Sequence, residues 1–339
     1  SNFGVIQNNE IGGGHVNVGN SGNLEIKDNI FNAPYQQNLS SFNKIHNNRF
    51  QIKNYSTGDA AGVIISNQGH DNSIQNNSVD GSWDGIDHQA YNFEQYHGSD
   101  DGIIISDESN DIVSGNTITS NWDCGIETVG FVKDSQFINN RINNSGVCGI
   151  GAWYWNSWLG NTIESNIING AAYMFYLYRV YGLNQYSNEQ IIYFKDNTFR
   201  NNQFLNQRVT SYVGATNVYS AWINFETLPS ELTPEQIQLG NNLFIDNDMG
   251  ENLPGPILRP AGMFINGGNN MCGPIDSNLH YLNSAAICIA PEYPCAGTSD
   301  SRPCPAGYIC RIKEPVRGDA APAGYCVPST VASPFPTPS

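Results

Sequence analysis

The sequence predicts an all-β fold: a right-handed parallel β-helix solenoid followed by a small disulfide-rich module. Three observations support this prediction. Short β-branched runs recur about every 20–24 residues, Asn recurs at a fixed place in that repeat, and the composition changes near residue 284, after which Asn is absent. A repeat of this length with strand-like periodicity is typical of a solenoid whose coils are made of strands and turns. The Leu framework of leucine-rich repeats and the 3.6-residue period of helical repeats are both missing.

The first repeated element is a Gly followed by an apolar residue. The series runs through "AGVI", "DGID", "DGII", "CGIE" and "CGIG", and "AAYM" places Ala172 where the Gly would be. The glycines of the series are Gly62, Gly85, Gly102, Gly125 and Gly149. A Gly at the start of a strand suits a tight bend, so we expect these positions to stack on one another.

The second repeated element is an Asn that is followed, two positions later, by an apolar residue. Its members are Asn9, Asn29, Asn48, Asn77, Asn116, Asn140, Asn161 and Asn197. Asn tolerates the left-handed backbone of a sharp turn, and its amide can donate to one coil and accept from another. Coils lie about 4.8 Å apart, so a ladder of stacked Asn side chains is expected.

The repeat defines the domains. We expect the solenoid over residues 1–270, with insertions near 51–61, 176–192 and 203–238, a Cys-rich module over 271–328, and a Pro/Ser/Thr linker over 329–339. Within the last insertion, Thr233 and Pro234 resemble a helix start. The chain begins within repeat sequence, so a removed leader or a longer parent chain is expected.

The motifs "DDGIIISDESNDIVSGNTITSNWDCGIETVG" (100–130) and "VCGIGAWYWNSWLGNTIESNIING" (147–170) resemble right-handed β-helices of the pectate-lyase-like superfamily. The resemblance is strongest to NosD-like repeats, also called carbohydrate-binding and sugar hydrolase repeats, and covers roughly residues 1–270. It implies the fold. It leaves the activity open, because the superfamily includes lyases, hydrolases, epimerases and adhesins. The stretch "CPAGYIC" (304–310) is similar to small extracellular EGF-like or other cysteine-rich modules.

Composition excludes some partners. The formal net charge is −16 and the pI is near 4.5, which argues against binding nucleic acid or anionic membrane surfaces. No apolar run is long enough for a membrane span. Few basic residues are available to bind an anionic sugar, so a polysaccharide lyase is disfavoured relative to a hydrolase.

The eight cysteines indicate an oxidising compartment and a secreted, extracellular protein. Cys124 and Cys148 occupy the position before the repeated Gly on successive coils, where a disulfide or a pair of stacked thiols would fit. The remaining six are expected to form disulfides, since their spacings do not suit zinc; they are Cys272, Cys288, Cys295, Cys304, Cys310 and Cys326.

Alternation along the strands defines a candidate catalytic face. If the residue after each Gly points inward, Asp87 and Glu127 share an outward row two coils apart. Their carboxyl groups could then reach the separation of an inverting glycosidase, with Asp101 assisting. The aromatic residues that could stack on sugar rings are Tyr91, Tyr96, Trp122, Trp153 and Trp155, although packing of loops is an equal explanation for them.

The same register places Asp84 and Asp101 one coil apart. Stacked carboxylates repel, so either one has a raised pKa or a cation lies between them. A Ca²⁺ site could be formed by Asp84, Asp100, Asp101 and Asp123, and the alternative is that these are solvated turn residues.

Two functions therefore remain open. The chain could be an extracellular β-helix that binds or processes a glycan, and if it is an enzyme, it would be a polysaccharide hydrolase. It could instead be a non-catalytic structural or adhesive domain of a filament, cell wall or surface coat, with self-association or further chain at the N-terminal end of the solenoid. Asn-x-Ser sequons, which could make it a glycoprotein, occur at Asn38, Asn54, Asn76 and Asn143.

Overall fold

The protein was analysed as a computed structural model. It describes residues 3–13, 15–52, 61–85, 98–152, 156–178, 191–208, 219–225, 233–250, 256–259, 263–268, 270–271, 308–312 and 324–328. The chain divides into two compact units, Ser1–Ile287 and Cys288–Ser339. In the described part of the chain, no helix has the length and hydropathy needed to cross a lipid bilayer.

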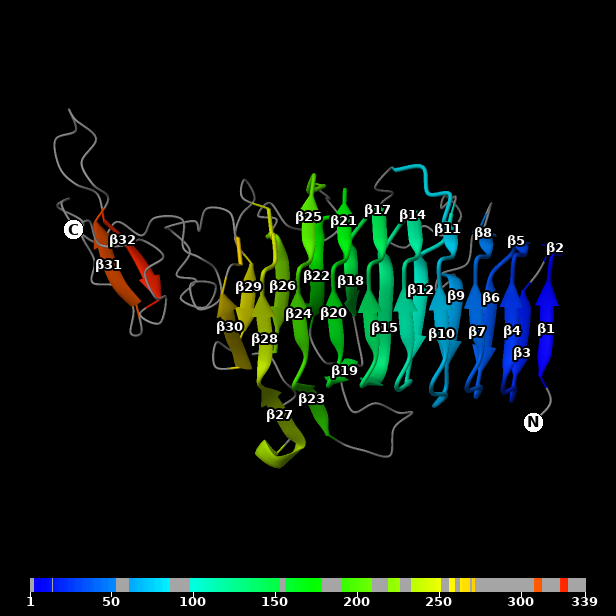
Figure 1. Ribbon diagram of the computed structural model, residues 1–339, viewed down its shortest axis with the longest axis horizontal. Coiled ribbons are helices and arrows are strands. Elements are labelled where there is room, and N and C mark those ends of the chain that lie inside the picture. The colour runs from blue at the N-terminus through cyan, green and yellow to red at the C-terminus, as the bar shows by residue number, and fades with distance from the viewer. Residues whose placement is uncertain are drawn as a thin grey trace, which may run out of the picture. The chain divides into compact units, whose positions relative to one another are not determined.

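The first unit is a parallel β-helix of three sheets, with parallel strand pairing throughout (Figure 1). Each coil contributes one strand to each sheet in turn, so strand neighbours are separated in sequence by a whole coil. Sheet A contains β1 (Gly4–Gln7), β4 (Leu24–Lys27), β7 (Lys44–His46), β10 (Ser73–Gln75), β13 (Ile112–Ser114), β16 (Gln136–Ile138), β20 (Thr162–Glu164), β24 (Thr198–Arg200), β28 (Asn242–Ile245) and β30 (Phe264–Gly268).

Sheets B and C follow the same rule. Sheet B contains β2 (Glu10–Gly12), β5 (Ile30–Asn32), β8 (Arg49–Gln51), β11 (Ser78–Asp80), β14 (Thr117–Asn121), β17 (Arg141–Ser145), β21 (Ile167–Asn169) and β25 (Gln203–Leu205). Sheet C contains β3 (Val16–Gly19), β6 (Tyr35–Asn38), β9 (Ala61–Ser66), β12 (Asp101–Ser106), β15 (Cys124–Lys133), β18 (Cys148–Ala152), β22 (Tyr173–Tyr178), β26 (Ala221–Asn224) and β29 (Ile257–Arg259).

The C-terminal end of the long strand β15 also pairs with β19 (Asn156–Leu159). This pairing continues from β19 to β23 (Ile192–Lys195) and from β23 to β27 (Ile237–Gly240). A 3₁₀ turn, η2 (Pro234–Gln236), precedes β27, and Thr233 N–H donates to Gln236 Oε1 over 2.9 Å. The predicted helix start at Thr233 is therefore confirmed as a single short turn. Two of the strands, β25 and β26, lie within the segment 203–238 that the sequence predicted to leave the solenoid, so only part of that segment is an insertion.

Each sheet A strand from β4 to β16 contributes one fully buried side chain to the interior. The sheet A row includes Ile26, Ile45, Ile74, Val113 and Phe137, all fully buried. Toward the later coils the filling becomes aromatic: Phe199 stacks on Phe244 with ring centroids 4.4 Å apart, and the Trp158 indole N–H donates to Thr128 Oγ1 over 2.8 Å. Aromatic stacking of this kind adds to the hydrophobic contribution of burial.

The expected Asn ladder is present, and there are two ladders rather than one. The ladder between sheets A and B runs through Asn9, Asn29, Asn48, Asn77, Asn116, Asn140, Asn166, Asn202, Asn247 and Asn270. At each step the backbone N–H and the side-chain amide of one Asn donate to the Oδ1 of the next. Because both donors share one acceptor, each ladder Asn fixes its turn and links two coils.

The second ladder lies between sheets C and A, before each sheet A strand. It contains Asn43, Asn72, Asp111, Ser135, Asn161, Asn197 and Asn242. Asn161 and Asn197 were predicted to continue the first ladder, and that assignment is wrong. In both kinds of turn an Asn lies two residues before a buried apolar residue of the next strand, so the local pattern cannot distinguish them.

The second unit is described only at β31 (Tyr308–Ile312) and β32 (Gly324–Pro328), an antiparallel pair. Its backbone register places Cys310 opposite Cys326. Cys272, Cys288, Cys295 and Cys304 lie outside the described residues, so the disulfide-rich module stays a prediction.

Candidate functional site

The candidate site lies where the strands of sheet C begin. The register pairs Val63 with Ile103, Ile103 with Ile126, and Ile126 with Ile150, so the glycines before them stack as predicted. A Cβ on Gly102 would overlap the Ile118 side chain, and a Cβ on Gly125 would overlap Ile142. Sheet C therefore starts so close to sheet B that only Gly fits there. The residues before these glycines, Ala61, Asp101, Cys124 and Cys148, are buried as well.

Gly85 does not belong to this stack. The coil before Gly102 begins at Gly62, 40 residues earlier, and the residue paired with Asp101 is Ala61. Gly85 lies between β11 and β12 with a φ of +81°, and the adjacent Asp84 is exposed. The prediction that Asp84 lies one coil from Asp101 is therefore wrong, because the 17-residue interval from Gly85 to Gly102 is too short to form a coil of three strands.

The register also slips at the end of the series. Ile150 pairs with Phe175 and Cys148 with Tyr173, so Met174 rather than Ala172 follows Gly149 in the stack. The bulky side chain at this position shows that the glycine requirement ends at this coil.

The residue before the Gly forms a row of its own: Asp101, Cys124, Cys148 and Tyr173. Cys124 and Cys148 form a disulfide across adjacent coils, with Cα atoms 4.5 Å apart, which confirms this pairing. Both cysteines are fully buried. The disulfide therefore cross-links two coils directly beside the carboxyl group of Asp101.

Asp101 forms a carboxyl pair with Glu127. The Asp101 side chain is almost completely buried, and its Oδ1 accepts a hydrogen bond from Cys124 N–H over 3.0 Å. Its carboxyl group also shares a hydrogen bond with Glu127, which projects from the outward row of β15 and is half-buried. Burial, then the nearby charges of Glu127 and Asp100, raise the pKa of Asp101 well above its ordinary value. A hydrogen bond between two carboxyl groups needs a shared proton, and the raised pKa of Asp101 favours its retention.

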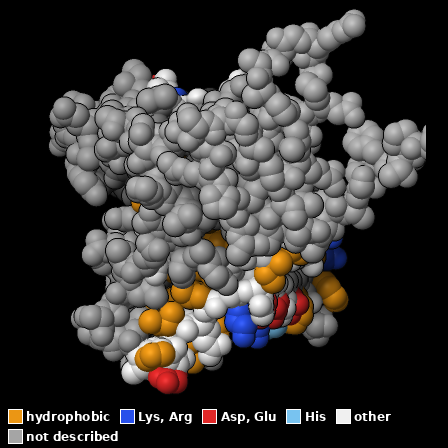
Figure 2. Space-filling model, turned by 90° about the vertical axis from the view of Figure 1, so that its left-hand side faces the viewer, with side chains coloured by type: hydrophobic (Ala, Val, Ile, Leu, Met, Phe, Trp, Pro, Cys, Tyr) orange, Lys and Arg blue, Asp and Glu red, His pale blue; other side chains and the backbone are white. Residues whose placement is uncertain are grey.

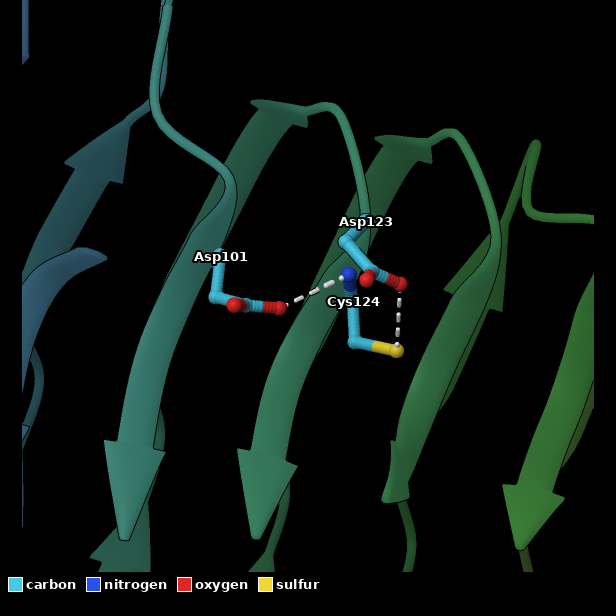
Figure 3. A group of neighbouring side chains, drawn as sticks. All are labelled: Asp101, Asp123 and Cys124. Carbon is cyan, nitrogen blue, oxygen red and sulfur yellow. Dashed lines mark hydrogen bonds between the residues drawn. The ribbon is translucent and has the colours of Figure 1, made fainter. Parts of the chain in front are cut away.

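Asp123 approaches the same place from the turn before β15 (Figure 3). Ligand atoms of Asp101, Asp123 and Cys124 lie within 4.8 Å of one another, and Asp123 Oδ1 is 3.2 Å from Cys124 Sγ. That sulfur is bonded to Cys148, so it carries no proton to donate and is no thiolate ligand. Two carboxyl groups remain in this cluster, with those of Asp100 and Glu127 close to Asp101. The Asp101 carboxyl is already hydrogen bonded to Cys124 N–H and to Glu127, which leaves few free oxygens for Ca²⁺ in this arrangement.

Asp100 lies beside this group. It is half-buried, and its carbonyl oxygen accepts a hydrogen bond from Asp123 N–H over 2.7 Å. Three of the four residues predicted to bind a metal, Asp100, Asp101 and Asp123, are therefore close together, and Asp84 is not part of the group.

The aromatic residues and sequons are only partly described. Trp122 is half-buried in the turn before Asp123. Asp87, Tyr91, Tyr96, Trp153, Trp155 and Asn54 lie outside the described residues. Of the other predicted glycosylation sites, Asn76 is exposed in a turn, whereas Asn38 and Asn143 are half-buried and hydrogen bonded through Oδ1 to Ser66 and Asn169.

A cation near this end of sheet B was missed by sequence reasoning. The Arg208 guanidinium lies 4.3 Å above the Trp83 ring, donates to Asn144 Oδ1 over 3.2 Å, and donates to the carbonyl oxygen of Gly85. It links two turns that are 123 residues apart in the sequence. No local pattern signals such a contact.

A second buried acidic group, also missed, lies at the opposite end of β12. Glu108 accepts hydrogen bonds from Gly69 N–H (3.0 Å) and from the Asn72 amide (3.3 Å), and burial, followed by the charge of Asp111, raises its pKa to about 9. Asp111 occupies a ladder position where Asn is usual, and its Oδ1 accepts from Asn72 N–H over 2.8 Å. The sequence signal was the substitution of Asp for Asn, which becomes visible only when the ladder is known.

Comparison with known proteins agrees with the geometry. Residues 88–204 match the family model described as "Right handed beta helix region". With the three parallel sheets, this match identifies the solenoid as a right-handed parallel β-helix. At a coarse level, such a domain fits proteins that bind or process glycans. No curated protein matches the chain.

Proposed function

We propose that this β-helix binds a glycan on the outward face of sheet C, outside the cell, and hydrolyses it with the carboxyl pair of Asp101 and Glu127. The observation that carries the proposal is the hydrogen bond between the buried carboxyl of Asp101 and the half-buried carboxyl of Glu127 on adjacent strands. Buried carboxyl pairs that retain a proton near neutral pH are characteristic of acid–base sites.

The two carboxyl groups differ in burial, and we assign them different roles for that reason. Glu127 is the accessible member, and we assign it the transfer of a proton to the glycosidic oxygen, with Asp101 behind it as the proton reserve. Asp101 and Glu127 are in hydrogen-bond contact, much closer than the roughly 6.5–9.5 Å of an inverting pair or the 5–5.5 Å of a retaining pair. They therefore act as one acid unit, and a separate carboxylate must activate the water.

Asp100 is our candidate for that base. Its charge is close enough to contribute to the raised pKa of Asp101, and its side chain is half-buried. Asp87 was predicted to pair with Glu127 because Gly85 was placed in the glycine stack. Gly85 lies outside that stack, so the prediction loses its support.

The charge of the site favours a neutral or weakly charged glycan. Four carboxyl groups gather here, those of Asp100, Asp101, Asp123 and Glu127, in a chain of net charge −16. The nearby cation among the described residues, Arg208, is stacked on Trp83 and hydrogen bonded to Asn144. An anionic polyuronate would be repelled. Figure 2 views the molecule from the left-hand side of Figure 1 rather than onto sheet C, and the described side chains visible there include basic, acidic and hydrophobic ones close together.

An extracellular site agrees with the disulfide. Disulfides persist in oxidising compartments and are rare in the cytosol. The buried Cys124–Cys148 bond lies beside Asp101, so the carboxyl pair and the cross-link would form together.

The test is a panel of neutral, amino and acidic polysaccharides, with reducing ends as the readout. The parent is expected to cleave at least one neutral glycan, and Glu127→Gln is expected to lower the rate at least ~100-fold, the usual range for a general acid. Asp84→Asn is the matched control, because Asp84 is exposed and outside the stack. Unchanged turnover in Glu127→Gln, or a parent that cleaves nothing on the panel, would overturn the assignment.

A structural or adhesive role is the second candidate. It is favoured by the length and regularity of the ladders, which extend from Asn9 to Asn270, and it predicts a parent that cleaves no glycan at all.

A further inference from the structure

Two carboxyl groups of one coil hold a turn of the coil before it. The turn is residues 69–72, which lie between β9 and β10. Gly69 N–H donates to Glu108 Oε1 over 3.0 Å, and Asn72 N–H donates to Asp111 Oδ1 over 2.8 Å. The Asn72 side-chain amide also donates to Glu108 Oε2 over 3.3 Å. Glu108 and Asp111 therefore fasten both ends of the turn, and we call these two residues the carboxyl clamp.

The carboxyl clamp is buried. Glu108 is 2% exposed and Asp111 is fully buried. A Cβ on Gly69 would overlap the Glu108 carboxyl group and the carbonyl oxygen of Ser40, so the packing around the clamp is tight. Asp111 Oδ2 receives no hydrogen bond from the described residues. A buried carboxyl group with such an oxygen is costly to ionise, so the closed turn favours neutral acids.

The charges around the clamp do not neutralise it. In the described part of the chain, neither Glu108 nor Asp111 forms an ion pair with Lys, Arg or His. His70, in the turn itself, is paired with Asp71 over 2.6 Å. The other charged side chains on the neighbouring segments are Lys44 at the start of β7, Asp107 beside Glu108, and Lys133 and Asp134, which lie 3.7 Å from each other.

The pKa values agree with this geometry. Burial, followed by the charge of Asp111, raises the pKa of Glu108 to about 9, and burial raises the pKa of Asp111 to about 7. The hydrogen bonds from Asn72 and the charge of His70 lower the pKa of Asp111 and are outweighed. In an open turn both carboxyl groups would be in water, with ordinary pKa values of about 4. The closed turn is therefore most stable below about pH 4 and loses this stability as the pH rises through 7 and then 9.

We propose that the carboxyl clamp is a pH-sensitive switch: the turn 69–72 is closed while the clamp retains its protons, and it opens locally when both carboxyl groups are charged. Opening breaks the hydrogen bonds of Gly69 and Asn72 and leaves β10 paired with β13. The His70 ring, which packs edge-on against Phe42 with centroids 5.0 Å apart, lies in this turn. The surface formed by these two rings therefore changes with pH. The proposal is independent of the glycan site, because Asp101 lies at the opposite end of β12.

Amide hydrogen exchange of the full chain at pH 6 and pH 9 tests the switch, with each rate divided by the rate of an unprotected amide at that pH. The protection of the Gly69 and Asn72 amides is expected to fall at least ~10-fold at pH 9, because each pH unit of pKa shift changes the opening equilibrium up to tenfold. The Ser135 and Asn197 amides are the matched controls. They occupy similar turns on other coils but donate to the neutral side chains of Asn161 and Asn242, so their protection should not change.

The double variant Glu108→Gln and Asp111→Asn keeps acceptor oxygens at both ends of the turn and removes both ionisable groups. It is expected to keep the same protection of Gly69 and Asn72 at the two pH values, and circular dichroism checks that it folds. The comparison of the four amides within the parent needs no variant. The proposal is overturned if Gly69 and Asn72 stay equally protected at pH 9 in the parent, if Ser135 and Asn197 lose as much protection, or if the folded double variant shows the parent's pH dependence.

Discussion

Replacing Asp111 by Asn is expected to stabilise the solenoid above neutral pH. Asp111 is fully buried, its Oδ1 serves the ladder, and its Oδ2 receives no hydrogen bond from the described residues. The charges of Asp71 and His70 contribute to the pKa of Asp111, and those of Asp111 and Asp107 contribute to the pKa of its neighbour Glu108. Burial is the main reason that the pKa of Asp111 rises from 3.8 to about 7.

The sign follows from linkage. The folded state binds this proton more tightly than the unfolded state, so its stabilising effect is complete below about pH 4 and is lost as the pH rises through 7. The rise in the pKa of Asp111 corresponds to at most ~4 kcal/mol at ~1.4 kcal/mol per pH unit. Allowing for relaxation around the charge, we expect Asp111→Asn to gain about 1–3 kcal/mol at pH 8 and close to nothing at pH 4.

The assay is thermal and urea unfolding of parent and variant at pH 4 and pH 8. An Asn keeps the Oδ1 acceptor that Asn72 N–H needs and stays neutral at both pH values. Asp111→Ala, which removes the acceptor, is the matched comparison and should destabilise at both. If Asp111→Asn gives the same change at pH 4 and pH 8, or destabilises at pH 8, the reasoning about a buried charge in the ladder is refuted.

Three further outcomes follow from the geometry of sheet C. Gly102→Ala should cost about 3 kcal/mol or more, because the methyl group overlaps Ile118, and a melting curve will show it; an unchanged melting temperature would contradict the close approach of the sheets. Replacing both Cys124 and Cys148 by Ser should cost about 2–4 kcal/mol in urea unfolding, whereas a smaller loss would mean that the cross-link contributes little. Millimolar Ca²⁺ should leave the melting temperature unchanged, because the Asp101 carboxyl is already hydrogen bonded to Cys124 N–H and Glu127 and the sulfur is oxidised; a rise would restore the predicted calcium site.

The sequence predicted the parts of the fold that repeat locally. The stacking of Gly62, Gly102, Gly125 and Gly149 follows from a strand start that must pass close to a core side chain, and the same packing recurs on each coil. The disulfide followed from the same register. These features depend on a few residues at a fixed offset, which is the information that a repeat preserves.

What the sequence could not supply was the length of each coil. The segment "DGI" at Asp84 matches the motif at Asp101 residue for residue, and only the structure shows that the first copy lies off the stack. The pairing of Asp101 with Glu127 was likewise not evident, because the two were assigned separate roles on the same face. Their contact depends on how side chains from adjacent strands meet, which spacing alone does not determine.

The ladder keeps one geometry over very different lengths of chain. Nineteen residues separate Asn29 from Asn48, and 45 separate Asn202 from Asn247, yet the amide-to-oxygen distances are 3.0 Å and 2.9 Å. The geometry of the ladder therefore does not depend on how many residues lie between successive ladder Asn residues. Foreign segments could therefore be inserted between two successive ladder residues, and we expect the solenoid to keep its fold.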